Sequence, residues 1–130
     1  MELQEKINDI IEAFNLNFKI TTISVSENYV AKTDTRKKEI KYSPELLKKI
    51  QKHLNISEEK TDLFFKYILV HEIGHIFDNM KDKDYENILQ MEIDAWEIGE
   101  SLIDWTEDED KELFQKIKNY CLDSYTKAYC

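Results

Sequence analysis

The chain has 130 residues, enough for one hydrophobic core and too few for two, so we expect a single domain spanning residues 1–130. Apolar residues make up 42% of the sequence and there are only two glycines and one proline, which excludes a disordered or linker-rich chain. The formal net charge of −9 opposes direct binding to nucleic acid or to an anionic membrane surface.

The N-terminal residues carry acidic side chains and lack the apolar stretch of a signal peptide, and the sequence has no run of about 18 apolar residues that could cross a membrane. We therefore expect a cytoplasmic protein with no membrane contact. Both cysteines, Cys121 and Cys130, lie near the C-terminal end. In a cytosolic chain this predicts free thiols, with a disulfide between them as the less favoured alternative.

The first part of the chain predicts a helix followed by short strands. Apolar residues recur at steps of three and four from Leu3, which indicates an amphipathic helix that ends near Asn15. Residues 18–25 and 29–31 are rich in β-branched and aromatic side chains and are separated by a polar turn, so they predict a hairpin. Residues 39–42 then predict a third strand, which would complete a small antiparallel three-stranded sheet.

Two helices are predicted next. Ser43 followed by Pro44 is typical of an N-cap with proline at the first helical position, and predicts a short helix that ends near His53. Ser57 is a plausible cap for a long helix over residues 58–79. The middle of that helix is apolar on nearly every side, so it should lie in the core.

The C-terminal part predicts two more helices, at residues 85–104 and 107–125. The second would begin at a capping box formed by Thr106 and Glu109. The chain as a whole is therefore expected to have an α+β fold that is mainly helical.

The sequence His71-Glu72-Ile73-Gly74-His75 has the metalloprotease pattern H-E-x-x-H and lies inside the predicted core helix. Residues four apart on a helix share a face, so both imidazoles can bind one metal ion and Glu72 can reach a water molecule beside it. The alternative is that both histidines are buried core residues with ordinary hydrogen bonds. His53, the third histidine, has no partner nearby in the sequence and is expected to be an ordinary residue near a helix end.

Gly74 interrupts the motif at a position where glycine costs about 1 kcal/mol relative to alanine. Its presence predicts that something, such as a strand or a ligand, passes close to the helix there.

A catalytic zinc ion usually has three protein ligands, so one more ligand is expected. Glu92 falls near the middle of the apolar face of the next predicted helix, where an unpaired carboxylate would be costly and a metal-bound one would not. Glu92 is therefore the favoured third ligand, with pairing to a lysine or capping of another helix as the alternative. Asp94 falls outside that face, and Asp94 or Glu97 could accept a hydrogen bond from a ligand imidazole.

The H-E-x-x-H motif, followed after 16 residues by Glu92-Ile93-Asp94-Ala95, resembles the gluzincins, which are zinc peptidases with a glutamate as third ligand. It is most similar to the small ImmA/IrrE-type metallopeptidases. The resemblance implies a minimal zincin-like domain, a peptide or protein substrate that could be a DNA-binding repressor, and an edge strand near the metal that binds the substrate. Residues 40–42 are the candidate edge strand.

The predicted function is zinc-dependent peptide hydrolysis, with Zn²⁺ held by His71, His75 and Glu92 and with Glu72 as general base. The oxyanion donor would be a backbone N–H or one of four tyrosines, namely Tyr29, Tyr42, Tyr67 and Tyr85. A catalytically silent zinc-binding domain that acts through a protein partner is the main alternative, and a metal-free structural domain is the other. The presence of Glu72 in the motif favours the enzyme hypothesis, because a structural zinc site needs no general base.

Overall fold

The computed structural model describes residues 2–80 and 88–123, and of Met80 only the backbone. The chain forms helices and a small sheet in the order α1 (Leu3–Ala13), β1 (Thr21–Ser24), β2 (Ala31–Asp34), β3 (Glu39–Tyr42), α2 (Pro44–His53), the short 3-10 helix η1 (Glu58–Lys60), α3 (Thr61–Met80), α4 (Ile88–Ser101) and α5 (Lys111–Asp123). The predicted α+β, mainly helical fold is thus confirmed. None of the described helices combines the length and apolar character needed to span a lipid bilayer.

The sheet is mixed, so the prediction of an antiparallel sheet was wrong. Its strand order is β1-β3-β2, with β1 parallel to β3 and β2 antiparallel to β3. The hairpin forms between β2 and β3, because the Asp34 carboxylate accepts hydrogen bonds from the backbone N–H groups of Arg36 and Lys37 and closes a tight turn there. Lys38 completes the turn with a φ of 53°.

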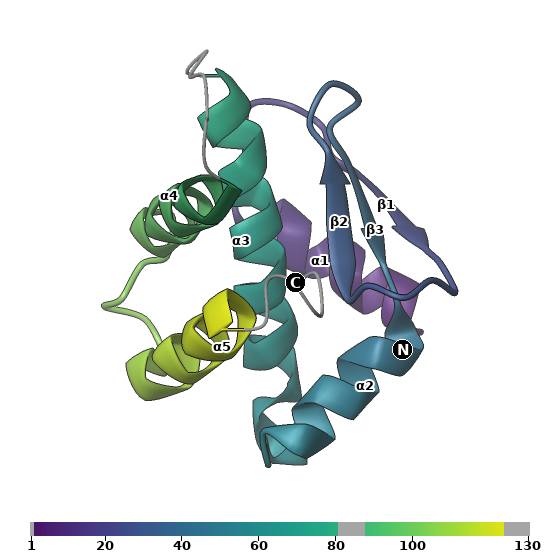
Figure 1. Cartoon of the computed structure of the whole chain (residues 1–130), viewed down its shortest axis with the longest axis vertical. Helices are drawn as coiled ribbons and strands as arrows, with labels where there is room; N and C mark the ends of the chain where they lie inside the picture. Colours follow the sequence, from purple (N-terminus) through teal and green to yellow (C-terminus); the bar gives the residue numbers. More distant parts are fainter. Residues whose placement is uncertain (1, 81–87, 124–130) are drawn as a thin grey trace.

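The sheet order also corrects the expected substrate-binding strand. Residues 40–42 belong to β3, which lies in the centre of the sheet and has strand partners on both sides. The edge strands are β1 and β2, and β2 is the one beside α3, between α3 and β3 in Figure 1. Among the described residues, the outer edge of β2 has no strand partner.

Helix α3 runs through the middle of the molecule and contacts most of the other elements (Figure 1). Most of its apolar side chains are buried, and Phe64, Ile68, Val70 and Ile73 are each at most 1% exposed. The sequence predicted this core position from the lack of a polar face. Charged groups on such a helix are desolvated, so the motif histidines and glutamate lie in a low-dielectric environment.

Helices α3 and α4 approach each other closely at two glycines. A Cβ atom on Gly74 would lie 2.1 Å from the carbonyl oxygen of Ala95, and a Cβ atom on Gly99 would lie 2.8 Å from the carbonyl oxygen of Val70. The close approach expected at Gly74 is therefore confirmed. The neighbouring group is the backbone of another helix, not a strand or a ligand.

Of the two serines predicted to be helix N-caps, Ser43 caps its helix and Ser57 does not. The backbone N–H of Leu46 donates to the Ser43 hydroxyl at 3.2 Å, as expected for an N-cap before Pro44. Ser57 precedes η1 and makes no side-chain cap hydrogen bond.

The capping box predicted at Thr106 and Glu109 was wrong. Helix α5 begins at Lys111, and its N-cap is Asp110, whose carboxylate accepts from the N–H of Leu113 at 3.0 Å. The Thr106 hydroxyl instead donates to Asp104, and Glu109 binds Lys66. The tertiary contact of Glu109 with α3 outweighs the local cap, because it satisfies a carboxylate that is largely buried.

Cys121 is buried in the core on α5. Cys130 and Tyr85 lie outside the described residues, and so does the last part of the helix expected at 107–125. The thiol state of the two cysteines stays a prediction.

Candidate metal centre

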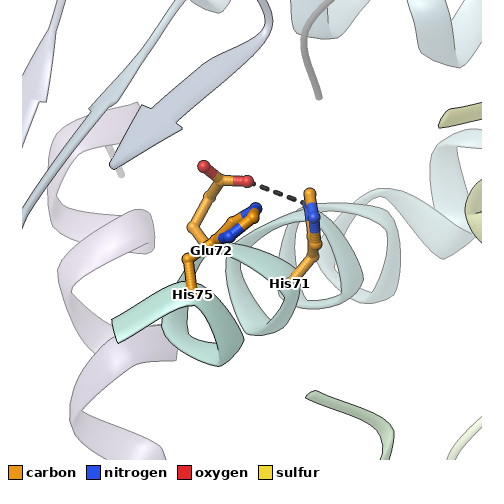
Figure 2. A group of neighbouring side chains, drawn as sticks. All are labelled: His71, Glu72 and His75. Atoms are coloured by element: carbon orange, nitrogen blue, oxygen red, sulfur yellow. Dashed lines mark ion pairs between the residues drawn. The ribbon is translucent and has the colours of Figure 1, made fainter. Parts of the chain in front are cut away.

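The structure brings the four predicted site residues together. His71, Glu72 and His75 project from α3 into a common space, as Figure 2 shows, and Glu92 reaches them from α4. His71 and Glu72 are at most 2% exposed, whereas the side chain of His75 is 12% exposed. The group is therefore a buried polar cluster with one side open.

Glu92 lies between the two imidazoles. Its Oε2 atom is 2.8 Å from His71 Nε2 and 3.1 Å from His75 Nε2. Ala95, whose carbonyl oxygen contacts Gly74, lies about one turn further along α4. The glycine contact thus sets the distance between the helices that lets the carboxylate reach both rings.

Two sets of side chains in this cluster could hold a cation. The ligand atoms of His71, Glu72 and His75 all lie within 4.8 Å of one another. In the second set, Glu92 replaces Glu72. One carboxylate oxygen of Glu92 contacts the Nε2 atoms of both histidines. His71 faces Glu72 with its other nitrogen, since its Nδ1 is 2.9 Å from Glu72 Oε2.

The geometry favours the set that contains Glu92. Among the described residues, the Nε2 atoms of the two histidines share one neighbouring oxygen, which belongs to Glu92. Glu72 Oε1 already accepts a hydrogen bond from Thr33. In this arrangement His71, His75 and Glu92 could serve as three ligands, and Glu72 would remain an adjacent carboxylate.

The residues fit a zinc ion. Two imidazole nitrogens and a carboxylate oxygen are ordinary zinc ligands, and in a tetrahedral site with bonds of about 2.0–2.1 Å such atoms lie about 3.3 Å apart. The distances of 2.8 and 3.1 Å require the ligands to separate by only a few tenths of an ångström. His71 Nδ1 and Glu72 Oε2 are both buried and lie 2.9 Å apart as an ion pair, so the second nitrogen of the His71 ring faces Glu72 and Nε2 faces Glu92.

The electrostatics of the cluster follow from burial and opposite charges. Burial alone would lower the pKa of His71, but the adjacent carboxylates of Glu72 and Glu92 outweigh it and raise that pKa to about 9. Burial would raise the pKa of Glu92, yet its hydrogen bonds with His71 and His75 lower it to about 2. Burial likewise opposes ionisation of Glu72, and the charge of His71 more than offsets it and lowers the pKa of Glu72. Both glutamates are therefore anionic at neutral pH.

Trp96 on α4 fixes the plane of the first histidine. Its indole stacks on the His71 imidazole with ring centroids 4.4 Å apart and an interplanar angle of 5°. Phe114 of α5 contacts the indole edge-to-face at 5.5 Å, so the last helix supports the site through Trp96. Nothing in the sequence indicated this role, because Trp96 matched only the apolar periodicity of its helix.

Thr33 on the edge strand β2 is the second contact that sequence reasoning missed. Its hydroxyl donates to Glu72 Oε1 at 2.9 Å and lies 3.4 Å from the Glu72 carbonyl oxygen. The hydrogen bond joins residues 39 positions apart in the chain, which no local pattern could indicate. It holds the Glu72 carboxylate in one orientation beside the imidazoles.

We expect Thr33→Val to lower the free energy of unfolding by about 1–2 kcal/mol, because the valine leaves a buried carboxylate oxygen without its donor. Urea unfolding of the two proteins measures this difference. Thr33→Ser keeps the hydroxyl and should recover most of the loss. A valine variant as stable as the wild type would show that the hydrogen bond contributes nothing.

A cavity of about 370 Å³ opens beside the cluster. It lies between β2, α3 and α4, and its lining includes Thr33, Glu72, His75 and Glu92 together with the apolar side chains of Ile88 and Met91. The cavity connects the polar cluster with the outside of the molecule.

Several other predicted residues are not at the site. The Tyr42 hydroxyl donates to Gln4 at 2.7 Å, and the Tyr67 hydroxyl donates to Glu109 at 2.9 Å and accepts from the N–H of Asp110 at 2.8 Å. The hydroxyl groups of both tyrosines are thus engaged in structural hydrogen bonds. The prediction that Tyr42 or Tyr67 could be the oxyanion donor was therefore wrong. Tyr29 lines a neighbouring cavity.

For His71, the prediction that Asp94 or Glu97 accepts the imidazole N–H was wrong. Among the described residues the carboxylate nearest to His71 Nδ1 is Glu72, and neither Asp94 nor Glu97 hydrogen-bonds to that nitrogen. Asp94 accepts from Gln90 and Glu97 is exposed. His53 lies at the end of α2, where it contacts the ring of Tyr120.

Comparison of the chain with protein-family models, with curated proteins and with solved structures finds no match. The function must therefore be argued from the site.

Proposed function

We propose that this protein is a zinc-dependent metallopeptidase that hydrolyses a peptide bond in a peptide or protein substrate. The main observation behind the proposal is that one oxygen of Glu92 contacts both Nε2 atoms of His71 and His75, beside an open cavity that Glu72 also lines. An N,N,O ligand set with one open side is typical of catalytic zinc sites.

Bound zinc supplies Lewis acidity, which lowers the pKa of water to about 7 and polarises a carbonyl oxygen. Glu72 accepts the proton of the attacking water and returns it to the leaving amine. The hydrogen bond from Thr33 to Oε1 orients the Glu72 carboxylate for this transfer, and the second oxygen, Oε2, lies 2.9 Å from His71 Nδ1. Burial removes competing water from the carboxylate, so the proton is exchanged with the substrate.

The ligand assignment predicts which substitutions remove zinc. We expect His71→Ala, His75→Ala and Glu92→Ala each to weaken zinc binding by at least about 100-fold, because each removes one of three protein ligands. Glu72→Gln should bind zinc with unchanged affinity. Competition against a chromogenic chelator measures all four affinities.

The matched control for these variants is Glu97→Ala, which removes an exposed carboxylate from the same helix as Glu92. Weak binding in Glu72→Gln combined with normal binding in Glu92→Ala would reverse the assignment and favour the set with Glu72.

The direct test of the activity is cleavage of a denatured protein mixture by the zinc-loaded chain, followed by mass spectrometry of new termini. Cleavage should disappear when a chelator removes zinc and return when zinc is restored. Tight zinc binding with no cleavage of any substrate would favour a catalytically silent domain that acts through a protein partner.

A further inference from the structure

A cationic face lies next to the candidate site on an otherwise acidic protein. Residues 32–41 contain five basic side chains and two acidic ones, in a chain whose formal net charge is −9. Lys32, Arg36 and Lys41 line a cavity of about 500 Å³ together with Tyr29. We call the surface formed by these three basic residues the cationic face.

The charges of the cationic face are poorly compensated within the chain. Lys32 and Lys41 are direct partners in the register of β2 and β3, and like charges in that position destabilise a strand pair. In the described part of the chain, Lys32 makes no ion pair, and Lys41 lies 4.0 Å from Glu39. Asp34 is already engaged by the backbone of the turn. The face is therefore suited to bind an anionic group.

The cationic face and the candidate site share the edge strand β2. Lys32, Thr33 and Thr35 line both the 500 Å³ cavity and the 370 Å³ cavity. Side chains alternate along the strand, so Ala31 is buried at 1% exposure, Lys32 is exposed, and Thr33 reaches Glu72. Lys32 and Thr33 therefore point to opposite faces of the strand, and the two cavities adjoin along it.

A peptide that pairs with the outer edge of β2 would divide its side chains between these faces. Successive residues of an extended chain point in opposite directions. One set would lie over the site cavity, which Ile88 and Met91 make apolar, and the other set would lie over the cationic face. Pairing with the edge would leave the peptide backbone beside Glu72.

We propose that the protein selects extended peptide segments in which acidic side chains alternate with apolar ones, the acidic side chains binding Lys32, Arg36 and Lys41. This inference rests on the proposed peptidase function and names its substrate class. A peptide fits better than a nucleic acid, because the face is small, lies beside a cavity with apolar walls, and belongs to a protein whose net charge repels a polyanion.

The test uses zinc-loaded Glu72→Gln protein and short fluorescent peptides in which leucine alternates with glutamate, glutamine or lysine. The glutamate peptide should bind about tenfold more tightly than the glutamine peptide, and the lysine peptide should bind most weakly. Lys32→Glu and Lys41→Glu should each remove the preference for glutamate, and the preference should weaken as salt is raised. Lys52→Glu, on the exposed side of α2, is the matched control and should leave it intact.

Equal binding of the three peptides would overturn the inference, and so would loss of the preference in Lys52→Glu. Displacement of the glutamate peptide by a single-stranded oligonucleotide at equal concentration would also overturn it, in favour of a nucleic-acid site. Cleavage by the wild type without charge preference would contradict this inference alone. Charge-selective binding without cleavage would support the selective face and contradict the peptidase function.

Discussion

Replacing Glu72 by glutamine is expected to lower the rate of peptide hydrolysis by about 1,000-fold while zinc content stays unchanged. Glutamine keeps the shape of the side chain and its hydrogen bond with Thr33, but it cannot accept a proton from water. A positioned general base contributes about 10²–10⁴-fold to such a reaction. The measurement is kcat/KM on a cleaved peptide, with zinc determined by elemental analysis in the same sample.

The matched control is Glu97→Gln, which neutralises an exposed carboxylate on α4 and should retain the wild-type rate. Hydrolysis by Glu72→Gln at the wild-type rate would remove Glu72 from the mechanism. Loss of zinc together with activity would instead make Glu72 a ligand, as in the alternative set with His71 and His75.

Gly74→Ala is expected to lower the free energy of unfolding by about 3 kcal/mol. In a helix interior, alanine is favoured over glycine by about 1 kcal/mol, so propensity alone predicts a gain. The added Cβ would lie 2.1 Å from the carbonyl oxygen of Ala95, however, and backbone cannot rotate away as a side chain can. Helices α3 and α4 must separate, which also moves Glu92 away from the two imidazoles and weakens zinc binding.

Chemical unfolding of the metal-free protein measures this effect without the contribution of zinc. Gly99→Ala should lower the free energy of unfolding by less than Gly74→Ala does. Its Cβ would lie 2.8 Å from the carbonyl oxygen of Val70, a longer distance than the 2.1 Å at Gly74. Asn79→Ala, at an exposed position on α3, is the control for helix propensity and should change stability little. A Gly74→Ala protein as stable as the wild type would show that the helices are not held at this distance.

The parts of the fold that depend on local periodicity were predictable. The apolar steps before Asn15, the Ser43–Pro44 cap and the apolar core helix are all short-range patterns, and the structure has each of them. The strand order was not predictable in this way, because pairing depends on contacts between distant segments. The turn that joins β2 to β3 contains no glycine and uses Lys38 at positive φ, so it lacked the usual signal of a hairpin.

The candidate site was likewise predictable where it depends on local patterns and not where it depends on tertiary contacts. Helix spacing places His71 and His75 on one face, and the cost of burying a carboxylate singled out Glu92, which the structure places between them. Thr33 and Trp96 reach the site through tertiary packing, from β2 and from α4. Their side chains have no feature in the sequence that distinguishes them from ordinary strand and core residues.

The most direct test of the metal centre is an anomalous-scattering map, recorded at the zinc absorption edge from crystals of the zinc-loaded protein. We expect one strong peak within about 2.1 Å of the Nε2 atoms of His71 and His75 and of a Glu92 carboxylate oxygen, with Glu72 not bonded to the metal. The absence of a peak in this cluster, or a peak bonded to Glu72 with Glu92 turned away, would contradict it.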